Sequence, residues 1–243
     1  QGTYSIKPFK KVKERPCIFE RIYFASPDSI VDSKTVYTYR KSLGEQLANE
    51  NKICADVVVP IPDSGVSAAI GFSQRSSIPF ELGIIRSHYV GRTFIEPSQT
   101  NRQFGVKLKH SVNRSCIENK KVVLIDDSIV RGTTASKIVK MVYEAGSKEV
   151  HLGISCPPIK YPDFDGIDTP SSEQLIASKS SLEEMTKLVG AKSLFFLSLK
   201  GTYTAMGCEE RNTNCPQFTD HCFTGDYPID VSDILKINSE LNE

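Results

Sequence analysis

The sequence contains no apolar run that approaches the roughly 20 residues a membrane-spanning helix needs. It also lacks an N-terminal apolar segment of the kind that directs secretion. From these absences we predict that the protein has no membrane partner and is cytoplasmic. We also predict that its seven cysteines are reduced rather than paired. Tryptophan is absent as well, which excludes no class of protein.

The sequence also lacks an excess of charge of either sign, since its formal net charge is +1. No overall field would attract a polyanion, and we predict no nucleic-acid partner. Positive charges gather in residues 1–15 and negative charges in residues 226–243, which solvated termini explain. There is no internal repeat and no low-complexity tract.

What is present is the composition of a globular protein, with 39% hydrophobic and 24% charged residues. We predict three segments along the chain. Residues 1–16 form a basic arm or interdomain linker, residues 17–225 form the folded domain, and residues 226–243 form an acidic C-terminal tail.

Apolar patterns within the domain predict strands at residues 17–25, 56–61, 80–85, 122–125, 149–156 and 194–199. Helices are expected at residues 33–51, 64–76, 172–177 and 181–189, with another following residue 132 and ending near residue 143. Residues 86–114 have little periodicity and predict a long loop, with room for a short helix. Strands that alternate with helices indicate an α/β fold with a central, mostly parallel sheet flanked by helices.

The most informative segment is residues 121–134, which reads KVVLIDDSIVRGTT. Its apolar run is typical of a buried parallel strand. Asp126 and Asp127 follow at the carboxyl end, where open α/β sheets bind ligands. Residues 128–134 then supply hydroxyl groups, a glycine and free backbone N–H groups at a helix start, which suit a phosphate monoester. Two acids beside such a loop predict a sugar-phosphate site, although an Asp-Asp pair alone is equally typical of a structural turn.

A second strand that ends in a turn of small residues occupies residues 57–65, VVVPIPDSG. The N–H groups of this turn and the Ser64 hydroxyl could hold a second phosphate group. Taken alone, the turn is more simply structural. Beside the first motif in a parallel sheet, it predicts one loop for a 5-phosphate and another for a pyrophosphate. Prolines around the turn also allow a strained or cis peptide bond.

A third candidate is the long segment at residues 86–114, in which basic side chains greatly outnumber the single acid, Glu96. Long loops inside compact domains are usually functional lids or disordered. A basic lid suits a pyrophosphate leaving group, whose departure needs neutralised charge and excluded water. The alternative is an ordinary solvated loop. The basic residues are Arg86, Arg92, Arg102, Lys107, Lys109 and Arg114.

Several segments occur in an order that resembles the glutamine phosphoribosylpyrophosphate amidotransferase family, a group of type I phosphoribosyltransferases. They are residues 22–29, 60–65, 86–95, 126–134, 166–168 and 173–177. The resemblance implies a type I phosphoribosyltransferase fold over residues 17–225, with a long flexible loop over the active site. It also implies an enzyme that forms 5-phosphoribosylamine and pyrophosphate from phosphoribosylpyrophosphate (PRPP) and ammonia, the first step of de novo purine biosynthesis.

The resemblance implies a role for individual residues. Tyr89 and Arg92 are the expected catalytic contacts with the leaving pyrophosphate, from a loop that closes over PRPP. Mg²⁺ is the expected cofactor, held by Ser64, Asp126 and Asp127 together with substrate oxygens. The residues expected to bind substrate are Asp63, Ser64, Gly65, Arg86, Asp126, Asp127, Ser128, Ile129, Val130, Arg131, Gly132, Thr133 and Thr134.

The resemblance also implies partners. Members of the family form homo-oligomers and bind purine nucleotides as inhibitors, and we expect both here. The family normally begins with a glutamine-hydrolysing domain whose N-terminal cysteine is the nucleophile, whereas this chain begins Gln1-Gly2-Thr3. We therefore expect synthesis from ammonia but not from glutamine, with a glutaminase domain or subunit as the nitrogen source. Two other functions stay open: a PRPP-sensing regulatory module and a salvage phosphoribosyltransferase for a free base.

Some family members carry a 4Fe–4S cluster on four cysteines. Cys17 and Cys222 match two of these positions, but Asp163 and Thr219 replace the cysteines expected at the other two. Because such a cluster normally needs four thiolates, we do not expect an iron–sulfur cluster. A zinc site is a comparable minor alternative, on Cys208, Cys215, His221 and Cys222.

Overall fold

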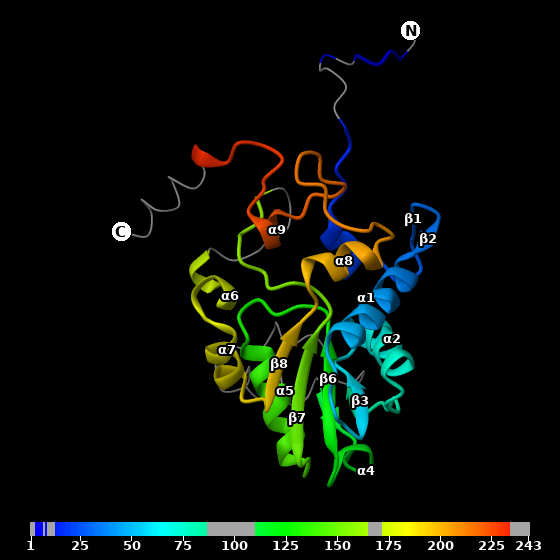
Figure 1. Ribbon diagram of the computed structural model, residues 1–243, viewed down its shortest axis with the longest axis vertical. Coiled ribbons are helices and arrows are strands. Elements are labelled where there is room, and N and C mark those ends of the chain that lie inside the picture. The colour runs from blue at the N-terminus through cyan, green and yellow to red at the C-terminus, as the bar shows by residue number, and fades with distance from the viewer. Residues whose placement is uncertain (1–2, 7, 9–12, 87–109, 165–171, 234–243) are drawn as a thin grey trace.

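The centre of the protein is a sheet of four parallel strands in the order β3-β6-β7-β8 (Figure 1). The computed structural model describes residues 3–6, 8, 13–86, 110–164 and 172–233. The strands are β3 (Val57–Pro60), β6 (Lys121–Asp126), β7 (Glu149–Ile154) and β8 (Ser193–Phe196). This parallel sheet confirms the predicted α/β class.

Helices cover both faces of the sheet, and this is why its central strands read as unbroken apolar runs. All four residues of β3 and residues 122–125 of β6 are buried. Helix α1 (Val36–Glu50) packs on α2 (Val66–Ser76), while α5 (Thr133–Glu144) packs against α7 (Leu182–Val189). Figure 1 shows the first pair on one side of the sheet and the second pair on the other. No helix in the described residues is long and apolar enough to cross a membrane.

Register places the ends of two strands side by side. Val59 of β3 is paired with Leu124 of β6, and Pro60 with Ile125. The predicted turn after β3 and the acids after β6 therefore emerge at the same edge of the sheet. On the other side of β6, Asp126 is paired with Ile154 of β7.

The predicted strand at residues 17–25 is wrong, because the chain is helical there and contains η1 (Glu20–Phe24). Ile18, Phe19 and Ile22 are all buried, a spacing that fits one face of a helix. A nine-residue window with mixed apolar and polar residues did not distinguish this pattern from strand alternation.

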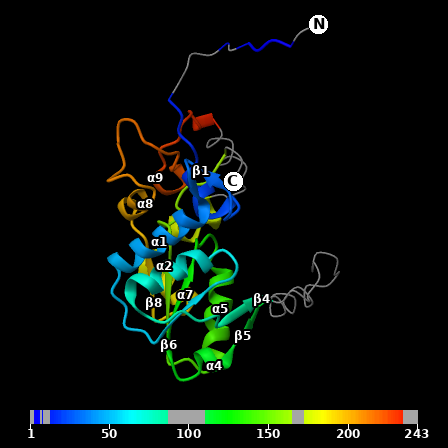
Figure 2. The same ribbon diagram turned by 90° about the vertical axis from the view of Figure 1, so that its right-hand side faces the viewer.

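The predicted strand at residues 80–85 is wrong over most of its length, because Phe80 makes only an isolated bridge to Val58 and the strand β4 (Ile84–Arg86) begins at Ile84. The ends of the long predicted loop are more regular than expected, since β4 pairs antiparallel with β5 (His110–Val112). This ribbon lies beside α5 (Figure 2). It is followed by a short helix, α4 (Arg114–Ile117). Residues 87–109 lie outside the described residues.

The C-terminal part of the domain contains elements that the sequence patterns did not predict. The expected strand at residues 194–199 ends at Phe196, and α8 (Leu199–Ala205) begins after Ser198, whose hydroxyl accepts from the Gly201 N–H at 2.9 Å. Helix α9 (His221–Thr224) follows later. The smaller elements are β1 (Ile30–Val31), β2 (Lys34–Thr35), η3 (Ser172–Gln174) and α6 (Ile176–Lys179).

Candidate active site

The turn after β3 approaches the end of β6 very closely. Gly65 lies at the start of α2, and a Cβ atom there would be 2.3 Å from the Ile125 carbonyl oxygen. The absence of a side chain therefore allows the turn to pack against β6 and brings Ser64 beside Asp127. The peptide bond between Pro62 and Asp63 is cis. It is a bond after a proline rather than before one, which the sequence pattern did not single out.

Asp126 and Asp127 lie at the end of β6 and have different surroundings. The Asp127 N–H donates to Asp126 Oδ1 at 2.9 Å, and the Ser128 hydroxyl donates to Asp127 Oδ1 at 2.5 Å. Burial raises the pKa of Asp126 well above its usual value, and the neighbouring Asp127 charge raises it further. Two carboxylates brought together in this way are suited to a divalent cation.

The negative charge of Asp127 is stabilised by more neighbouring groups than that of Asp126. Burial raises its pKa too, but hydrogen bonding by Ser128 and Ser64 and the charge of Arg40 all oppose that rise. Arg40 is itself buried on α1. Its guanidinium donates to the Arg21 carbonyl at 3.2 Å and to the Ala25 carbonyl at 2.8 Å, at either end of η1. One buried cation thus links η1 to the acid pair.

Residues 128–134 form the predicted loop and helix start. Gly132 has φ +77°, a left-handed conformation that favours glycine, and it precedes α5. Its carbonyl accepts from the Ser136 N–H at 2.9 Å, so the helix begins directly after the loop. Thr133 and Thr134 are exposed in the first turn of α5. Hydroxyl groups and N–H groups at a helix start are the arrangement expected for binding an anion.

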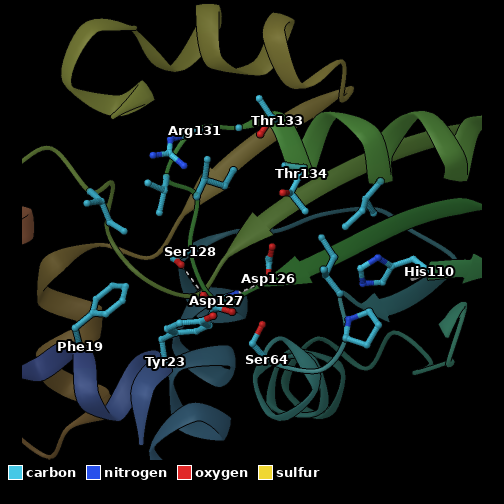
Figure 3. Close-up of a pocket in the computed structure, with 18 of the residues that line it drawn as sticks. Phe19, Tyr23, Ser64, His110, Asp126, Asp127, Ser128, Arg131, Thr133 and Thr134 are labelled. Carbon is cyan, nitrogen blue, oxygen red and sulfur yellow. Dashed lines mark hydrogen bonds between the residues drawn. The ribbon is translucent and has the colours of Figure 1, made fainter. Parts of the chain in front are cut away.

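These two motifs line one cavity of about 490 Å³. Figure 3 shows Ser64, Asp126 and Asp127 at its floor and Arg131, Thr133 and Thr134 on one wall. The volume is in the usual range for a small-molecule site. Of the residues predicted to bind substrate, the cavity is lined by Ser64, Asp126, Asp127, Ser128, Ile129, Val130, Arg131, Gly132, Thr133 and Thr134.

An aromatic wall opposite the loop at residues 128–134 was not predicted. Phe19, Tyr23 and Phe24 come from the helical segment around η1, which the sequence pattern predicted as a strand, and all three line the cavity. Figure 3 shows the side chains of Phe19 and Tyr23. The rings of Tyr23 and Phe24 are 5.0 Å apart, and those of Phe19 and Phe24 are 5.8 Å apart. The presence of Tyr23 and Phe24 in the segment at residues 22–29 was the available signal for two of these residues, and nothing in the sequence pattern singled out Phe19. The remaining lining residues are Ile61, Pro62, His110, Ala135, Ile138 and Ile159.

Three other predicted site residues, Asp63, Gly65 and Arg86, do not line this cavity. Asp63 and Arg86 form an ion pair with each other, and both side chains are largely exposed. Gly65 is buried where the turn packs against β6. Their roles in binding substrate stay predictions. Tyr89 and Arg92, the expected catalytic contacts, lie outside the described residues.

The four positions that correspond to cluster cysteines are close together. Cys17 forms an isolated bridge with Thr219, and the pKa of the buried Cys222 thiol is raised by burial and by the nearby Cys17 and Asp163. Asp163 pairs with His221, whose Nε2 is 2.6 Å from the carboxylate. Among the described residues, no three His, Cys, Asp or Glu side chains are arranged to hold a metal ion. The alternative zinc site on Cys208, Cys215, His221 and Cys222 is therefore not formed in this structure.

Known proteins match this chain over the segments that form the cavity. A family model described as "Phosphoribosyl transferase domain" matches residues 28–175. This range contains the turn at Ser64, both acids and the loop that ends at Thr134. The matched part is more than half of the chain.

Curated relatives extend the similarity to nearly the whole chain. It is 59% identical over 236 residues to an amidophosphoribosyltransferase from Rhizobium etli, covering 96% of this chain and 48% of the relative. It is 51% identical over 231 residues to one from Bacillus subtilis, covering 95% and 48%. The chain thus spans about half the length of the curated relatives it matches.

Among solved structures, the chain is similar to a glutamine PRPP amidotransferase from B. subtilis complexed with ADP and GMP. The TM-score is 0.83 at 49% sequence identity, and the match covers 91% of this chain and 48% of that one. The predicted type I phosphoribosyltransferase architecture is therefore confirmed.

Proposed function

This chain belongs to the phosphoribosyl transferase domain family, and on that premise we propose that it is the phosphoribosyl-transferring half of an amidophosphoribosyltransferase. Its reaction joins ammonia to PRPP and gives 5-phosphoribosylamine and pyrophosphate, in the first step of purine biosynthesis. One observation carries the proposal. The turn at Ser64 and the acid-and-loop segment at 126–134 line the same cavity from the ends of adjacent parallel strands.

The binding roles follow from the chemistry of each part of the cavity. The loop at residues 128–134 receives the 5-phosphate, since it ends in a helix start with exposed Thr133 and Thr134 hydroxyls. Asp126 and Asp127 accept hydrogen bonds from the ribose hydroxyls. Ser64 and its turn receive the pyrophosphate, and Arg86 pairs with Asp63 of the same turn.

The residues present fit a magnesium ion. Mg²⁺ is usually held by one or two carboxylates together with substrate phosphate oxygens, so a pair of acids without further protein ligands is suitable. Asp126 and Asp127, with Ser64 next to them, would hold it. When bound, the ion neutralises charge on the acids and on the leaving pyrophosphate.

The reaction itself needs little acid or base catalysis from the chain. The C1–O bond to pyrophosphate breaks, the C1–N bond to ammonia forms, and the nitrogen loses a proton to solvent. Ammonia has the free electron pair for this attack and ammonium does not. The chain therefore has to position PRPP, stabilise the charge of the leaving group and exclude water. Tyr89 and Arg92 stay the proposed contacts with that leaving group.

Further parts of the proposal concern the complete enzyme. A glutaminase domain or subunit supplies the ammonia, and the chain forms homo-oligomers in the cytoplasm. Purine nucleotides bind as inhibitors, an idea supported by the similar B. subtilis structure complexed with ADP and GMP. These proposals rest on relatives about twice as long as this chain.

The test is to incubate the chain with PRPP, Mg²⁺ and ammonium salts and to measure pyrophosphate release. We expect release with ammonium, rising with pH at constant total ammonium, and none above background with glutamine. Asp126→Asn and Asp127→Asn should each lower kcat/KM by about 100-fold or more, since each removes a charge in contact with substrate and metal. Glu144→Gln, at the far end of α5, is the control and should keep full activity.

The same assay separates the alternatives. PRPP binding without release under any condition would indicate a sensing module. Release with a free purine or pyrimidine base but not with ammonium would indicate a salvage enzyme. Vigorous glutamine hydrolysis by this chain would contradict the division of labour proposed here.

A further inference from the structure

Residues 174–176 pack against the loop at residues 128–132, the proposed 5-phosphate site, although they lie more than 40 positions further along the chain. The Ile176 N–H donates to the Val130 carbonyl at 2.9 Å. The side chain of Ile176 also packs near Gly132, where a Cβ atom would be 3.0 Å from Ile176 Cδ1. Leu175 is fully buried and anchors this segment in the core. The loop at residues 128–132 therefore rests on residues 174–176.

The same segment orients the only charged side chain of the loop. Both Nε and Nη2 of Arg131 donate to the Gln174 side-chain oxygen, at 3.0 and 2.6 Å. Arg131 lines the cavity, and Figure 3 shows it above the acid pair on the wall formed by the loop. Because both bonds end on one oxygen, the Nη1 group and the second Nη2 hydrogen have no bond to Gln174.

We propose that Gln174 is a positioning residue, which orients the Arg131 guanidinium toward the phosphate of the substrate without neutralising it. This inference rests on the proposed function, since it assigns a further residue to the same site. Gln174 is a neutral amide. It can fix the direction of the guanidinium through hydrogen bonds and leave the positive charge uncompensated.

The chemical distinction is between an amide and a carboxylate at position 174. A glutamate could accept the same two hydrogen bonds, but it would form an ion pair with Arg131 and compete with the phosphate dianion. An alanine would leave the charge in place and release the side chain, which must then be ordered when substrate binds. Charge and orientation can therefore be tested separately.

The experiment compares Gln174→Glu and Gln174→Ala in the full chain by calorimetric binding of ribose 5-phosphate and by KM for PRPP. We expect Gln174→Glu to weaken ribose 5-phosphate binding and raise KM about tenfold, and Gln174→Ala about threefold. In both variants kcat should change less than twofold, because the contact forms equally in the ground state and transition state. Position 174 is exposed, so both variants should unfold at the wild-type denaturant concentration.

Two controls separate this role from nearby charge and from general structure. Lys179→Gln on α6 changes the net charge by the same amount as Gln174→Glu at another exposed position, and should bind as wild type. In an Arg131→Met background, Gln174→Glu should cause no further loss. A loss of the same size in that background, or equal losses in the glutamate and alanine variants, would overturn the inference.

The same measurements distinguish a failure of the Gln174 inference from a failure of the proposed function. If the wild-type chain binds ribose 5-phosphate but releases no pyrophosphate with ammonium, the proposed function fails and the Gln174 comparison is still measurable. If the wild type turns over PRPP and both Gln174 variants match it in binding and KM, the inference alone is wrong.

Discussion

At the scale of single residues, the site depends on a lack of atoms as much as on functional groups. Gly65 has an ordinary φ of −74°, so its requirement is space rather than backbone freedom. A Cβ atom would meet the carbonyl oxygens of Ile125 at 2.3 Å and Ile61 at 2.9 Å. Neither contact involves a flexible side chain that could move aside. The position of Ser64 beside Asp127 follows from this close approach.

We predict that Gly65→Ala destabilises the protein by about 1–3 kcal/mol, the usual cost of overpacking. It should also weaken PRPP binding, because the turn must shift away from β6. Urea denaturation and calorimetry measure the two effects. Gly190→Ala is the matched control, since φ there is +78° and a Cβ would meet nothing within 4 Å. It should cost about 1 kcal/mol of strain and leave binding unchanged. Unaltered binding in Gly65→Ala would contradict this account.

At the scale of elements, α8 and α9 are joined by a buried hydrogen-bonded network centred on Asp220. This carboxylate is fully buried and accepts from the Tyr203 hydroxyl at 2.8 Å and from Arg211 Nε at 2.7 Å. Thr224 on α9 also donates to it, at 3.1 Å. Burial and the Asp220 charge raise the pKa of Tyr203, so its hydroxyl remains a donor. The network holds together helices that are short and have few apolar residues.

We predict that Tyr203→Phe lowers the free energy of unfolding by about 1–2 kcal/mol, because it removes a donor from a buried carboxylate. PRPP binding should be unaffected, since the network is not part of the cavity lining. Tyr37→Phe is the control, as that ring is on the exposed part of α1 and should change stability by less than about 0.5 kcal/mol. Equal stability of the two variants would show that the network contributes little.

At the scale of the whole molecule, the start of the folded domain at residues 15–18 is joined to residues 219–226 near its end. The Ile18 N–H donates to the Thr219 carbonyl and the Thr219 N–H donates to the Pro16 carbonyl, both at 3.0 Å. Asp226 pairs with Arg211 and with Arg15, the latter at 3.3 Å. Figure 1 shows both ends of the described chain beyond the same edge of the central sheet as the helices α8 and α9. Contacts of such long sequence separation report on global unfolding.

The ion pairs of Asp226 with Arg211 and Arg15 predict that the protein loses stability in acid. The hydrogen bond from Arg211, with the charge of Arg15, holds the pKa of Asp226 below its usual value. A carboxyl group whose pKa is lower in the folded than in the unfolded state stabilises the fold above its unfolded pKa of about 3.9. That contribution is lost as the pH falls through the folded value.

Asp226→Asn should therefore be less stable than wild type near neutral pH, and the difference should shrink as the pH falls toward about 3. Denaturation of both proteins at several pH values measures this. If the free energies of unfolding of the two proteins differ by the same amount at every pH, the prediction is wrong. Glu144→Gln, which removes an exposed carboxylate, is the control for the pH dependence that any lost carboxylate causes. Because the Asp226 side chain is 42% exposed, solvent screening keeps the effect modest.

Local patterns in the sequence were enough to predict the central strands, most flanking helices and the polar half of the cavity. A buried strand followed by Asp126, Asp127 and a small-residue loop is defined by consecutive residues, and its geometry follows from strand pleat and helix start. The strand at residues 17–25 was predicted wrongly because a short apolar pattern fits two periods. Helices α8 and α9 were missed because distant contacts, rather than an apolar stripe, stabilise them.

The sequence by itself determined which chemical groups the site has and the strand ends from which they emerge. Only the tertiary structure decided what lies opposite and behind them. The aromatic wall from η1, the Arg40 cation behind Asp127 and the Gln174 amide on Arg131 all come from segments far from residues 126–134. The physical reason is that such contacts depend on how helices pack across the sheet, and no local period in the chain encodes that packing.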